Sequence, residues 1–383
     1  MSEKELRIIL AGGGTGGHLY PAIAIAEEMK ALRPKVDIVF VGTKGKIESR
    51  VVPEKGYDLK TIWVGGWSRR LSLGMVLFPF KLMVSFIQSY VFIKKFRPHV
   101  VVGTGGYVSG PVLYVATLLR IPTLIQEQNS YPGIASRFLA GRVDEVHVTF
   151  EVTKKYLKKG KREIKVSGNP TRAALGTVKR EHGALFFGLD AKKKTFLVFG
   201  GSLGAVRLND AILTLVQDLI AADIQLIWQT GTQDYDRIKS AAPLPNLIAV
   251  VSFIDRMEFA YAASDVVVCR AGATTVAEIT RVGIPAILVP YPYAAADHQV
   301  VNASTVADSG AAIVVLEHEL PGKLRTTLFN LLESRSERKK MSKRSLTLAR
   351  PHAGRDLAEA AMRLALLRSV PGASLQDDSS RRL

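Results

Sequence analysis

The feature that most constrains the fold is a recurring succession of short runs rich in Val, Ile and Leu, each followed by small or polar residues and then by a helical pattern. Continuous apolar runs are typical of parallel strands buried on both faces, and their alternation with helices indicates βαβ units. The rhythm restarts near residue 168, so we predict an α/β protein with two doubly wound domains. Predicted strands are residues 6–11, 38–42, 100–103, 123–126, 145–148, 195–199, 225–229, 247–250, 266–269, 286–289 and 312–315, with helices between them, for example 20–32, 111–119, 205–219 and 275–282.

Chain length supports two domains, because 383 residues exceed what one hydrophobic core usually organises. We place the first domain at residues 1–167 and the second at residues 168–350. A helix within residues 351–370 is expected to pack back on the first domain, and the polar residues 371–383 are expected to be disordered. Ligands of such sheets bind at the carboxyl ends of the strands, so two facing domains would form a ligand cleft.

Charge and cysteine content narrow the class of protein. The net charge is +18, and residues 1–167 hold 26 Lys and Arg against 13 Asp and Glu, which indicates a polyanionic partner. Cys269 is the single cysteine, so no intrachain disulfide can form and a reducing compartment is expected. The first ten residues show no signal-peptide pattern, and we therefore expect the protein to stay inside the cell.

The first glycine-rich loop joins a predicted strand to a predicted helix at residues 12–18 (Gly-Gly-Gly-Thr-Gly-Gly-His). Glycines let a backbone approach a phosphate, and a helix N-terminus supplies N–H donors. The acidic residue that binds a dinucleotide ribose is missing after the second strand, where residues 41–43 read Val-Gly-Thr. The loop therefore indicates a phosphate-containing ligand that is not a dinucleotide, although a tight turn without ligand has the same pattern.

Two further loops have a similar context, at residues 200–204 (Gly-Gly-Ser-Leu-Gly) and residues 270–278 (Arg-Ala-Gly-Ala-Thr-Thr-Val-Ala-Glu). Glu278 can accept hydrogen bonds from both hydroxyls of a ribose; alternatively, it only stabilises its helix N-terminus. Gln299 and Asn302 lie three residues apart, so on a helix they share a face that can reach a sugar or point to solvent. The seven histidines are scattered, and no metal site is predicted.

Five segments together carry a resemblance to one known family: residues 12–18, Gln128-Asn129, 168–172 (Gly-Asn-Pro-Thr-Arg), 200–204 and 270–278. They resemble the MurG family of bacterial N-acetylglucosaminyltransferases, which make lipid II for peptidoglycan. The resemblance implies a GT-B fold, in which two Rossmann-like domains face a cleft. It implies inverting transfer of N-acetylglucosamine from UDP-N-acetylglucosamine to the C4 hydroxyl of the N-acetylmuramyl unit of undecaprenyl-pyrophosphoryl-N-acetylmuramyl-pentapeptide (lipid I), with no cofactor or metal.

The resemblance also assigns contacts to the donor. Thr274, and His298 beside Gln299, depart from residues common in the family. Other cell-wall synthesis proteins are implied as partners, and nucleic acid is not. The implied donor-binding residues are Thr15, Gly16, Gly17, Asn129, Arg172, Ser202, Ile254, Ala273, Thr274, Thr275, Val276, Ala277, Glu278 and Gln299.

Inverting transfer requires a base for the attacking hydroxyl and positive groups for the departing diphosphate. Amides of the second and third loops and Arg172 suit the second task. We favour His18 as the base, because a helix N-terminus favours the neutral imidazole. Glu127 is the alternative, and a purely structural role for His18 stays open.

Two other classes of protein are compatible with parts of the sequence. A UDP-N-acetylglucosamine 2-epimerase would share the fold and the nucleotide sugar, but it has no use for a membrane-facing segment. A nucleic-acid-binding protein would explain the positive charge, yet helix-turn-helix, RNP and KH signatures are missing.

A long apolar segment at residues 71–93 contains one charged residue, Lys81. Its length would suffice to span a bilayer, but Pro79, Lys81 and its place between two strands favour a helix that lies on the membrane. We expect one stripe (Phe80, Val84, Ile87, Val91) to pack on the sheet and the other to face lipid, so that a soluble protein docks on anionic phospholipid at the cytoplasmic face of the cell (inner) membrane. The residues assigned to docking are Phe78, Leu82, Phe86, Arg69, Arg70, Lys81, Lys94 and Lys95.

Overall fold

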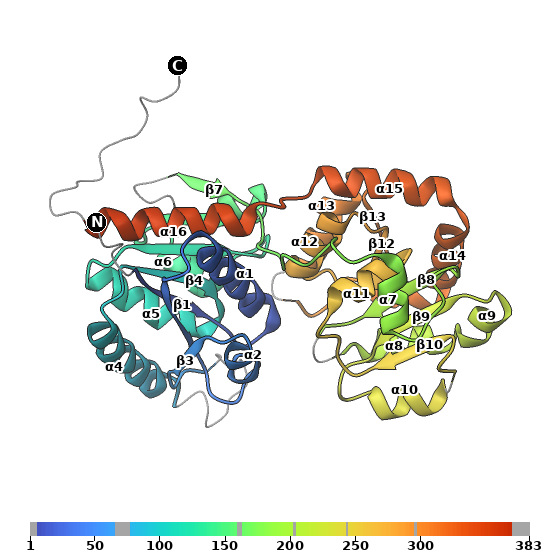
Figure 1. Ribbon diagram of the computed structural model, residues 1–383, viewed down its shortest axis with the longest axis horizontal. Coiled ribbons are helices and arrows are strands. Elements are labelled where there is room, and N and C mark those ends of the chain that lie inside the picture. Colours follow the sequence, from blue (N-terminus) through green and yellow to red (C-terminus); the bar gives the residue numbers. More distant parts are fainter. Residues whose placement is uncertain are drawn as a thin grey trace, which may run out of the picture. The chain divides into compact units, whose positions relative to one another are not determined.

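The computed structural model describes residues 6–65, 77–158, 163–201, 204–242, 244–294 and 297–369. The chain divides into two compact units (Figure 1). The first unit comprises Met1–Pro170 and His352–Leu383, and the second comprises Thr171–Pro351. Each unit is therefore built around its own parallel sheet.

The described part of the first unit forms a seven-stranded parallel sheet in the order β3-β2-β1-β4-β5-β6-β7. The two outer strands were not predicted, because β3 is mostly exposed and β7 has three residues. The strands are β1 (Arg7–Gly12), β2 (Asp37–Gly42), β3 (Asp58–Thr61), β4 (Val100–Gly105), β5 (Thr123–Glu127), β6 (Glu145–Val148) and β7 (Ile164–Val166). The helices are α1 (Gly16–Leu32), α2 (Glu48–Glu54), α4 (Phe78–Phe96), α5 (Gly106–Leu118), α6 (Ile134–Leu139), the 3-10 helix η1 (Glu151–Tyr156) and α16 (Ala353–Ser369).

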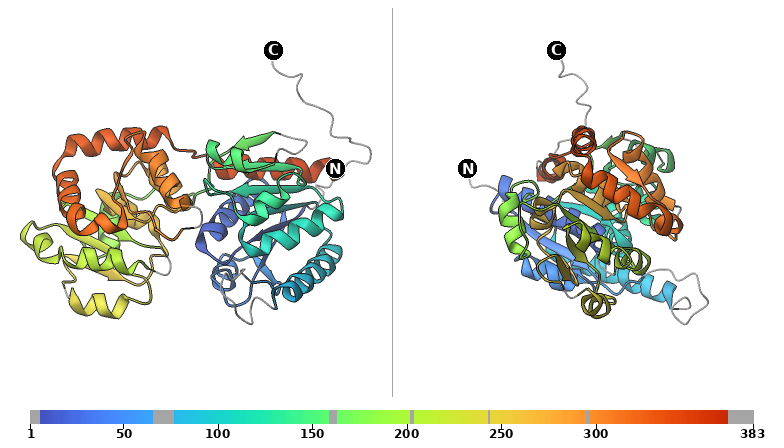
Figure 2. Two further views of the ribbon diagram at one scale, coloured as in Figure 1. Left: turned by 180° about the vertical axis from the view of Figure 1, so that it is seen from behind. Right: turned by 90° about the vertical axis from the view of Figure 1, so that its right-hand side faces the viewer.

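Both faces of the first sheet are covered by helices. Alternate side chains of a strand point to opposite faces, so Ile8 and Leu10 join one core with α1 and α16, whereas Ile9 and Ala11 join another with α5. Helix α16 packs along α1 and over β4, although more than 300 residues separate α16 from α1 in sequence (Figure 2). The C-terminal helix therefore completes the core of the first unit.

The described part of the second unit forms a six-stranded parallel sheet in the order β10-β9-β8-β11-β12-β13. All six predicted strands are present. They are β8 (Thr195–Phe199), β9 (Gln225–Gln229), β10 (Ile248–Val251), β11 (Val266–Cys269), β12 (Ala286–Leu288) and β13 (Ala312–Val314). The helices are α7 (Arg180–Phe186), α8 (Val206–Leu213), α9 (Val216–Ala221), α10 (Tyr235–Ala241), α11 (Met257–Ala263), α12 (Ala273–Val282), α13 (His298–Ala307), η3 (Glu317–Glu319), α14 (Leu320–Glu333) and α15 (Arg335–Thr347).

The single helix predicted over residues 205–219 is wrong, because the structure has two helices, α8 and α9, with a break at Thr214 and Leu215. The Thr214 hydroxyl donates to the Ala211 carbonyl at 2.8 Å, and the Leu215 amide donates to Ile212, three residues back. This tighter turn ends α8 and lets Leu215 enter the core.

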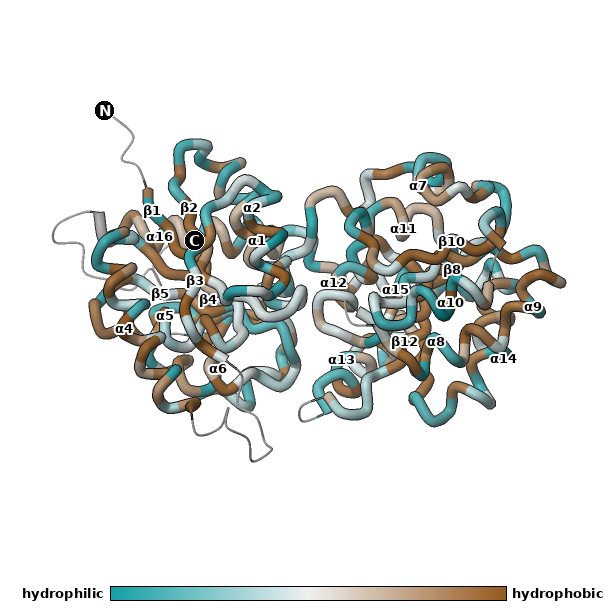
Figure 3. Tube along the Cα trace, turned by 90° about the horizontal axis from the view of Figure 1, so that it is seen from below, coloured by the Kyte–Doolittle hydropathy of each residue, from teal (hydrophilic) through white to brown (hydrophobic). Residues whose placement is uncertain are grey.

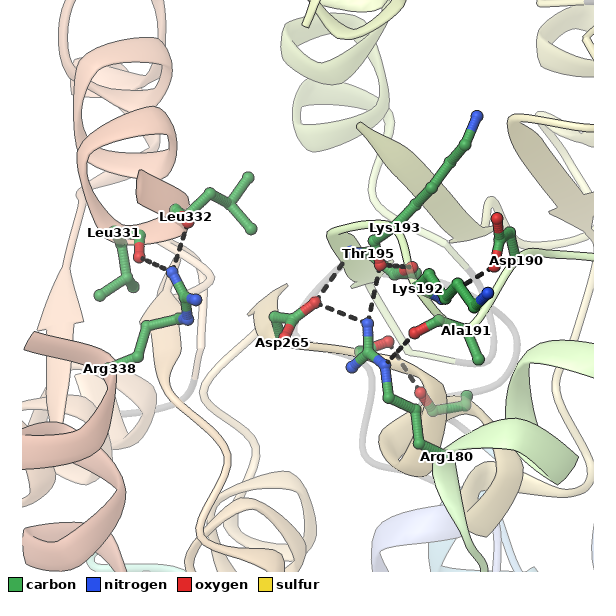
Figure 4. A network of polar contacts seen from close by, with 12 residues as sticks. Arg180, Asp190, Ala191, Lys192, Lys193, Thr195, Asp265, Leu331, Leu332 and Arg338 are labelled. Atoms are coloured by element: carbon green, nitrogen blue, oxygen red, sulfur yellow. Dashed lines mark hydrogen bonds and ion pairs between the residues drawn. The ribbon is translucent and has the colours of Figure 1, made fainter. Parts of the chain in front are cut away.

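A polar network closes the amino-terminal edge of the second sheet (Figure 4). Arg180 donates to the carbonyls of Ala191 and Lys193 and to the Asp265 carboxylate, which also accepts the Thr195 amide at 2.9 Å. These groups satisfy one another at the edge where β8 and β11 begin. In a sheet of this kind, a ligand site is expected at the opposite, carboxyl edge.

Candidate active site

Each sheet reverses its strand order at one point, between β1 and β4 in the first unit and between β8 and β11 in the second. Ligands of doubly wound sheets bind at the carboxyl ends of the strands that flank such a point. The glycine-rich loop at residues 12–18 follows β1, and the loops at residues 200–204 and 270–278 follow β8 and β11. The three loops that the sequence singled out thus lie at the two switch points.

His18 stands in the first turn of α1, where groups from neighbouring strands fix its ring. Its Nδ1 lies 3.2 Å from the Thr104 carbonyl oxygen and 3.0 Å from Gln128 Oε1. Both partners are acceptors, because Gln128 Nε2 is directed at the Thr104 and Gln126 carbonyls and so fixes the amide orientation. Nδ1 therefore carries the proton, and Nε2 of the neutral ring holds a lone pair.

Thr104 holds His18 through the backbone as well. Its hydroxyl donates to the His18 carbonyl at 2.8 Å, while its own carbonyl accepts from the His18 ring. Thr104 was not identified from the sequence. Its position at the end of β4, beside a glycine pair, was the available signal.

Glu127, the alternative base, is 3% exposed, and both of its carboxylate oxygens accept hydrogen bonds from backbone amides of the loop that follows β5. Oε1 accepts the Asn129 amide at 3.0 Å, and Oε2 accepts the Gly133 amide at 3.1 Å. The carboxylate thus shapes the loop that carries Asn129. This geometry favours His18 over Glu127 as the group that takes a proton.

The other donor-binding residues expected in the first unit lie at the N-terminus of α1. Thr15 is the N-cap residue, and Gly16 and Gly17 form the first turn. Thr15 and Gly17 are exposed, and Gly16 is partly exposed. They are placed where a ligand can reach the helix N-terminus.

Glu278 lies in the second turn of α12 and is 4% exposed. The Tyr261 hydroxyl donates to Oε2 at 3.1 Å, and Arg172 Nε lies 3.6 Å from Oε1. Burial raises the pKa of Glu278 above its usual value, against the opposing effects of the Arg172 charge and the Tyr261 hydrogen bond. Oε1 accepts no hydrogen bond from any described residue, so this atom can still accept one from a hydroxyl.

Arg172 is held in place beside this carboxylate. Its Nη1 donates to the Asp255 carbonyl at 2.9 Å, and its side chain is 19% exposed. Ile254, also expected to contact the donor, has a buried side chain and gives its amide to Gln229 Oε1. A ligand contact by Ile254 would therefore use its backbone carbonyl.

The first turn of α12 contains both buried and accessible residues. The side chains of Ala273 and Val276 are buried, whereas Thr274, Thr275 and Ala277 are partly exposed. Ser202, expected to bind the donor from the preceding loop, lies outside the described residues. A ligand at α12 would therefore meet threonine hydroxyls and the amides of the helix N-terminus.

The expectation that Gln299 and Asn302 on α13 share a face open to a sugar or to solvent is wrong for Asn302. Asn302 is fully buried, and its Nδ2 donates to the Ala271 carbonyl at 3.1 Å, so it supports the loop before α12 instead of reaching a sugar. Gln299 is partly exposed, and its Oε1 accepts the Tyr291 amide at 3.0 Å. Gln299 keeps its side-chain amide group for other contacts.

The apolar helix α4 exposes three residues of the stripe that we expected to be buried, Phe80, Ile87 and Val91, whereas Val84 is partly buried. Phe86 packs on the core and against the Tyr114 ring at 5.3 Å, and Phe78 and Leu82 are half-buried. The reason is that Ser85, Ser89 and Ile93, close to the Phe86 side of the helix, form its inner face. The exposed large residues of this segment are Leu77, Phe80, Met83, Ile87, Tyr90 and Val91. Much of α4 is coloured as hydrophobic in Figure 3.

Cationic groups accompany this exposed stripe. Lys81 Nζ lies 5.4 Å from the Trp63 ring centre, and Lys94 Nζ lies 5.8 Å from that of Tyr90. Lys95 is exposed, whereas Arg69 and Arg70 lie outside the described residues. No described helix is both long and apolar enough to cross a membrane.

The described residues contain no group of three or more His, Cys, Asp or Glu side chains that could hold a metal ion. Arg172 places a positive charge beside Glu278 in the second unit.

Comparison with known proteins gives consistent relationships. Residues 8–148 match the glycosyltransferase family 28 N-terminal domain, and residues 195–359 match its C-terminal domain. A Flavobacterium psychrophilum protein is 41% identical over 94% of this chain and 98% of its own length, and a Salinibacter ruber protein is 42% identical over 95% and 98%. Both are named UDP-N-acetylglucosamine–N-acetylmuramyl-(pentapeptide) pyrophosphoryl-undecaprenol N-acetylglucosamine transferase.

Solved structures include close matches to the whole fold. The crystal structure of Acinetobacter baumannii MurG covers 94% of this chain and 99% of its own, with a TM-score of 0.70 and 28% identity. A UDP-GlcNAc 2-epimerase from Neisseria meningitidis covers 95% and 100%, with a TM-score of 0.66 and 12% identity. At that identity the epimerase shares the fold alone.

Proposed function

Because the chain belongs to the UDP-N-acetylglucosamine–N-acetylmuramyl-(pentapeptide) pyrophosphoryl-undecaprenol N-acetylglucosamine transferases, we propose that it catalyses the reaction for which that family is named. It is a glycosyltransferase of the GT-B fold, whose donor is UDP-N-acetylglucosamine and whose acceptor is lipid I. The product is lipid II, the disaccharide precursor of peptidoglycan. The observation that carries this function is 41% identity over 94% of the chain.

We further propose an inverting mechanism with one in-line displacement. The C4 hydroxyl of the N-acetylmuramyl unit attacks the anomeric carbon of the donor. A new C–O bond forms as the bond from that carbon to the UDP oxygen breaks, and UDP leaves with the electron pair. The hydroxyl proton must be removed as the bond forms.

His18 is assigned to proton removal. The Thr104 carbonyl and Gln128 Oε1 keep the proton on Nδ1, so Nε2 is the atom that accepts the hydroxyl proton. A general base fixed in this way contributes roughly 10²–10⁴-fold to the rate. In histidine bases generally, a hydrogen bond from one ring nitrogen fixes the tautomer and leaves the lone pair on the other nitrogen.

The donor is assigned to Thr15, Gly16, Gly17 and Asn129 in the first unit and to residues around α12 in the second. The N-terminus of α12 offers amides to the diphosphate, and Arg172 supplies a fixed positive charge. Glu278 Oε1 accepts a ribose hydroxyl. The second-unit set is Arg172, Ser202, Ile254, Ala273, Thr274, Thr275, Val276, Ala277, Glu278 and Gln299.

The acceptor of the named relatives carries an undecaprenol chain, so the enzyme must work at a membrane surface. We propose peripheral docking on anionic phospholipid at the cytoplasmic face of the cell membrane. The exposed stripe of α4 supplies the apolar contact, and Lys81, Lys94 and Lys95 supply the charge. Other cell-wall synthesis proteins are proposed as further partners.

The stereochemistry of the product tests the mechanism. NMR of the disaccharide formed from UDP-N-acetylglucosamine and a water-soluble lipid I analogue should show a β-1,4 link, since the donor sugar is α-linked. An α-linked product would mean net retention of configuration, which a single in-line displacement cannot give, and would contradict the proposed mechanism.

A further inference from the structure

A buried carboxylate lies directly behind the glycine-rich loop of the first unit. Glu48 is the first residue of α2, is 0% exposed and forms no ion pair with any described cation. An unpaired charge is costly to bury unless hydrogen bonds replace its water. Glu48 is therefore expected to accept hydrogen bonds from the protein with both of its oxygens.

Both oxygens of Glu48 accept hydrogen bonds from the two loops that it joins. Oε2 accepts the Gly14 amide at 2.9 Å, and Oε1 accepts the Thr43 amide at 2.9 Å and the Thr43 hydroxyl at 2.7 Å. Gly14 belongs to the loop after β1, and Thr43 follows β2. The carboxylate thus fastens the loop after β1 to the adjacent strand end.

The glycines beside Glu48 leave room for its side chain. A Cβ atom on Gly13 would lie 2.6 Å from the Glu48 carboxyl carbon, and one on Gly42 would lie 2.6 Å from Glu48 Cγ. Gly12 is restricted by Thr104 Oγ1 in the same way, at 2.0 Å. Packing within the protein therefore explains two glycines of this loop, Gly12 and Gly13, without any approach of a phosphate.

Electrostatics also disfavour a phosphate at the Gly13–Gly14 turn. The Gly14 amide is already bound to a carboxylate, and a buried negative charge behind the turn opposes an anion on its other side. No acidic residue directly follows β2, but Glu48 of α2 places a carboxylate near the end of that strand. This carboxylate binds the protein's own loop instead of a ribose.

We propose that Glu48 is a positioning residue for the transfer reaction: it fixes the Gly13–Gly14 turn so that α1 begins at Gly16 and presents His18. The proposal rests on the proposed role of His18 as the base. His18 is the fourth residue after Gly14, so a shift of the turn moves the start of the helix that carries the imidazole. Displacing a base from the attacking hydroxyl lowers turnover without changing donor affinity.

Glu48→Gln is the direct test, because it keeps the shape but turns one acceptor into an amide donor that opposes the Gly14 N–H. Loss of a hydrogen bond to a charged group predicts a kcat lower by roughly tenfold to a hundredfold. The KM for UDP-N-acetylglucosamine and the number of UDP sites found by calorimetric titration should stay unchanged. Glu54→Gln, in the same helix but exposed and paired with Arg50, is the matched control and should retain full kcat.

A double-mutant cycle links Glu48 to the turn itself. Gly13→Ala should lower kcat because its Cβ meets the carboxyl group, but in a Glu48→Ala background it should cost little more, since the obstacle is gone. Additive losses would overturn the proposed contact. Unchanged kcat in folded Glu48→Gln would overturn the positioning role.

The unaltered protein supplies a check that does not depend on any variant folding. The Gly14 amide, although its residue is exposed, should exchange with deuterium slowly because Glu48 holds it, and rapid exchange would contradict the proposal. The turnover of His18→Ala, measured in parallel, distinguishes the positioning role of Glu48 from the role of His18 as the base. Loss of turnover in His18→Ala but not in Glu48→Gln refutes only the role of Glu48, whereas full turnover in His18→Ala refutes the base.

Discussion

The imidazole of His18 shows how a residue gains a defined chemical state from its neighbours. Two groups from the ends of β4 and β5, the Thr104 carbonyl and Gln128 Oε1, lie beside Nδ1 of the ring, and the Thr104 hydroxyl donates to the His18 backbone carbonyl. Parallel strands bring their carboxyl ends together, so residues far apart in sequence meet there. The ring is thereby set with Nε2 as its acceptor.

Replacing this histidine should separate chemistry from binding. His18→Ala should lower kcat by roughly 10²–10⁴-fold, because the hydroxyl proton then has no fixed acceptor. The affinity for UDP should barely change, since the amides at the N-terminus of α12 and the Arg172 charge, which we assign to the diphosphate, remain in place. Equal losses of UDP affinity, measured by calorimetry, and of turnover would instead make His18 a residue that positions phosphate.

The carboxylate of Glu278 should govern donor affinity. Glu278→Ala removes the proposed ribose contact, whose loss predicts a donor KM raised by roughly tenfold to a hundredfold. Tyr261→Phe is the companion variant, because it removes only the 3.1 Å hydrogen bond to Oε2 and leaves Oε1 in place. A donor KM that is unchanged in folded Glu278→Ala would remove Glu278 from the donor site.

Some residues of the candidate site could not be identified from the sequence. Glycine loops, His18 and Glu278 were recognisable because loop chemistry is local and their spacing is fixed by the strand–loop–helix pattern. Glu48, Thr104 and Tyr261 were not, because each acts on a partner that only the folded sheet brings near. The burial of Asn302 was not predicted for the same reason, since helical spacing cannot tell a buried face from an exposed one.

Helix α4 illustrates this ambiguity for a whole element. Its sequence is apolar on most sides, so the existence of the helix was predictable but its orientation was not. Ser85 and Ser89 lie on the buried side, where their hydroxyls donate to backbone carbonyls three or four residues earlier. Small residues let the helix approach α5 closely, which leaves the bulkier Phe80 and Ile87 outside.

Membrane docking should depend on the exposed stripe. Phe80→Ser/Ile87→Ser should weaken sedimentation with anionic vesicles, while turnover of a short water-soluble acceptor survives, because each side chain is more than half exposed and neither belongs to the core cluster that α4 joins. Leu185→Ser/Ile220→Ser, which alters exposed apolar residues of the second unit, is the matched control. Binding that ignores lipid charge and salt would contradict peripheral electrostatic docking.

An ion pair fastens α16 to the first sheet. Glu145 in β6 is buried and accepts from Arg363 at 2.6 Å. Burial alone would raise the pKa of Glu145, but hydrogen bonds from His147 and Arg363 and the charges of Arg363 and Lys165 lower it to about 2. The ionised carboxylate therefore stabilises the fold above pH ~4.5, and this contribution is lost as the pH falls towards 2.

Removing the arginine should show this dependence. Arg363→Gln should lower the free energy of unfolding of the first unit by about 1–2 kcal/mol at pH 7, because Arg363 is half-exposed and the pair is screened in part. The difference from wild type should shrink as the pH falls from 4.5 to 2. Arg355→Gln, in the same helix with an exposed partner, is the control, and an equal effect of both variants in urea unfolding would contradict the account.

For the molecule as a whole, the two parallel sheets followed from the sequence because buried parallel strands are continuous apolar runs. The strand order did not, because it depends on which strands pair, and the short outer strands β3 and β7 lack an apolar signature. The fold also leaves the reaction undecided, since an epimerase acting on the same nucleotide sugar shares it. Sequence identity to named transferases resolves that choice.

Transfer of labelled sugar tests the central claim most directly. The enzyme is incubated with UDP-N-acetylglucosamine radiolabelled in the sugar, with and without a lipid I analogue. We predict that label enters a disaccharide product only when the acceptor is present, and that without the acceptor the nucleotide sugar is recovered unchanged. Conversion to the 2-epimer in the absence of acceptor, or no transfer in its presence, would contradict the assignment.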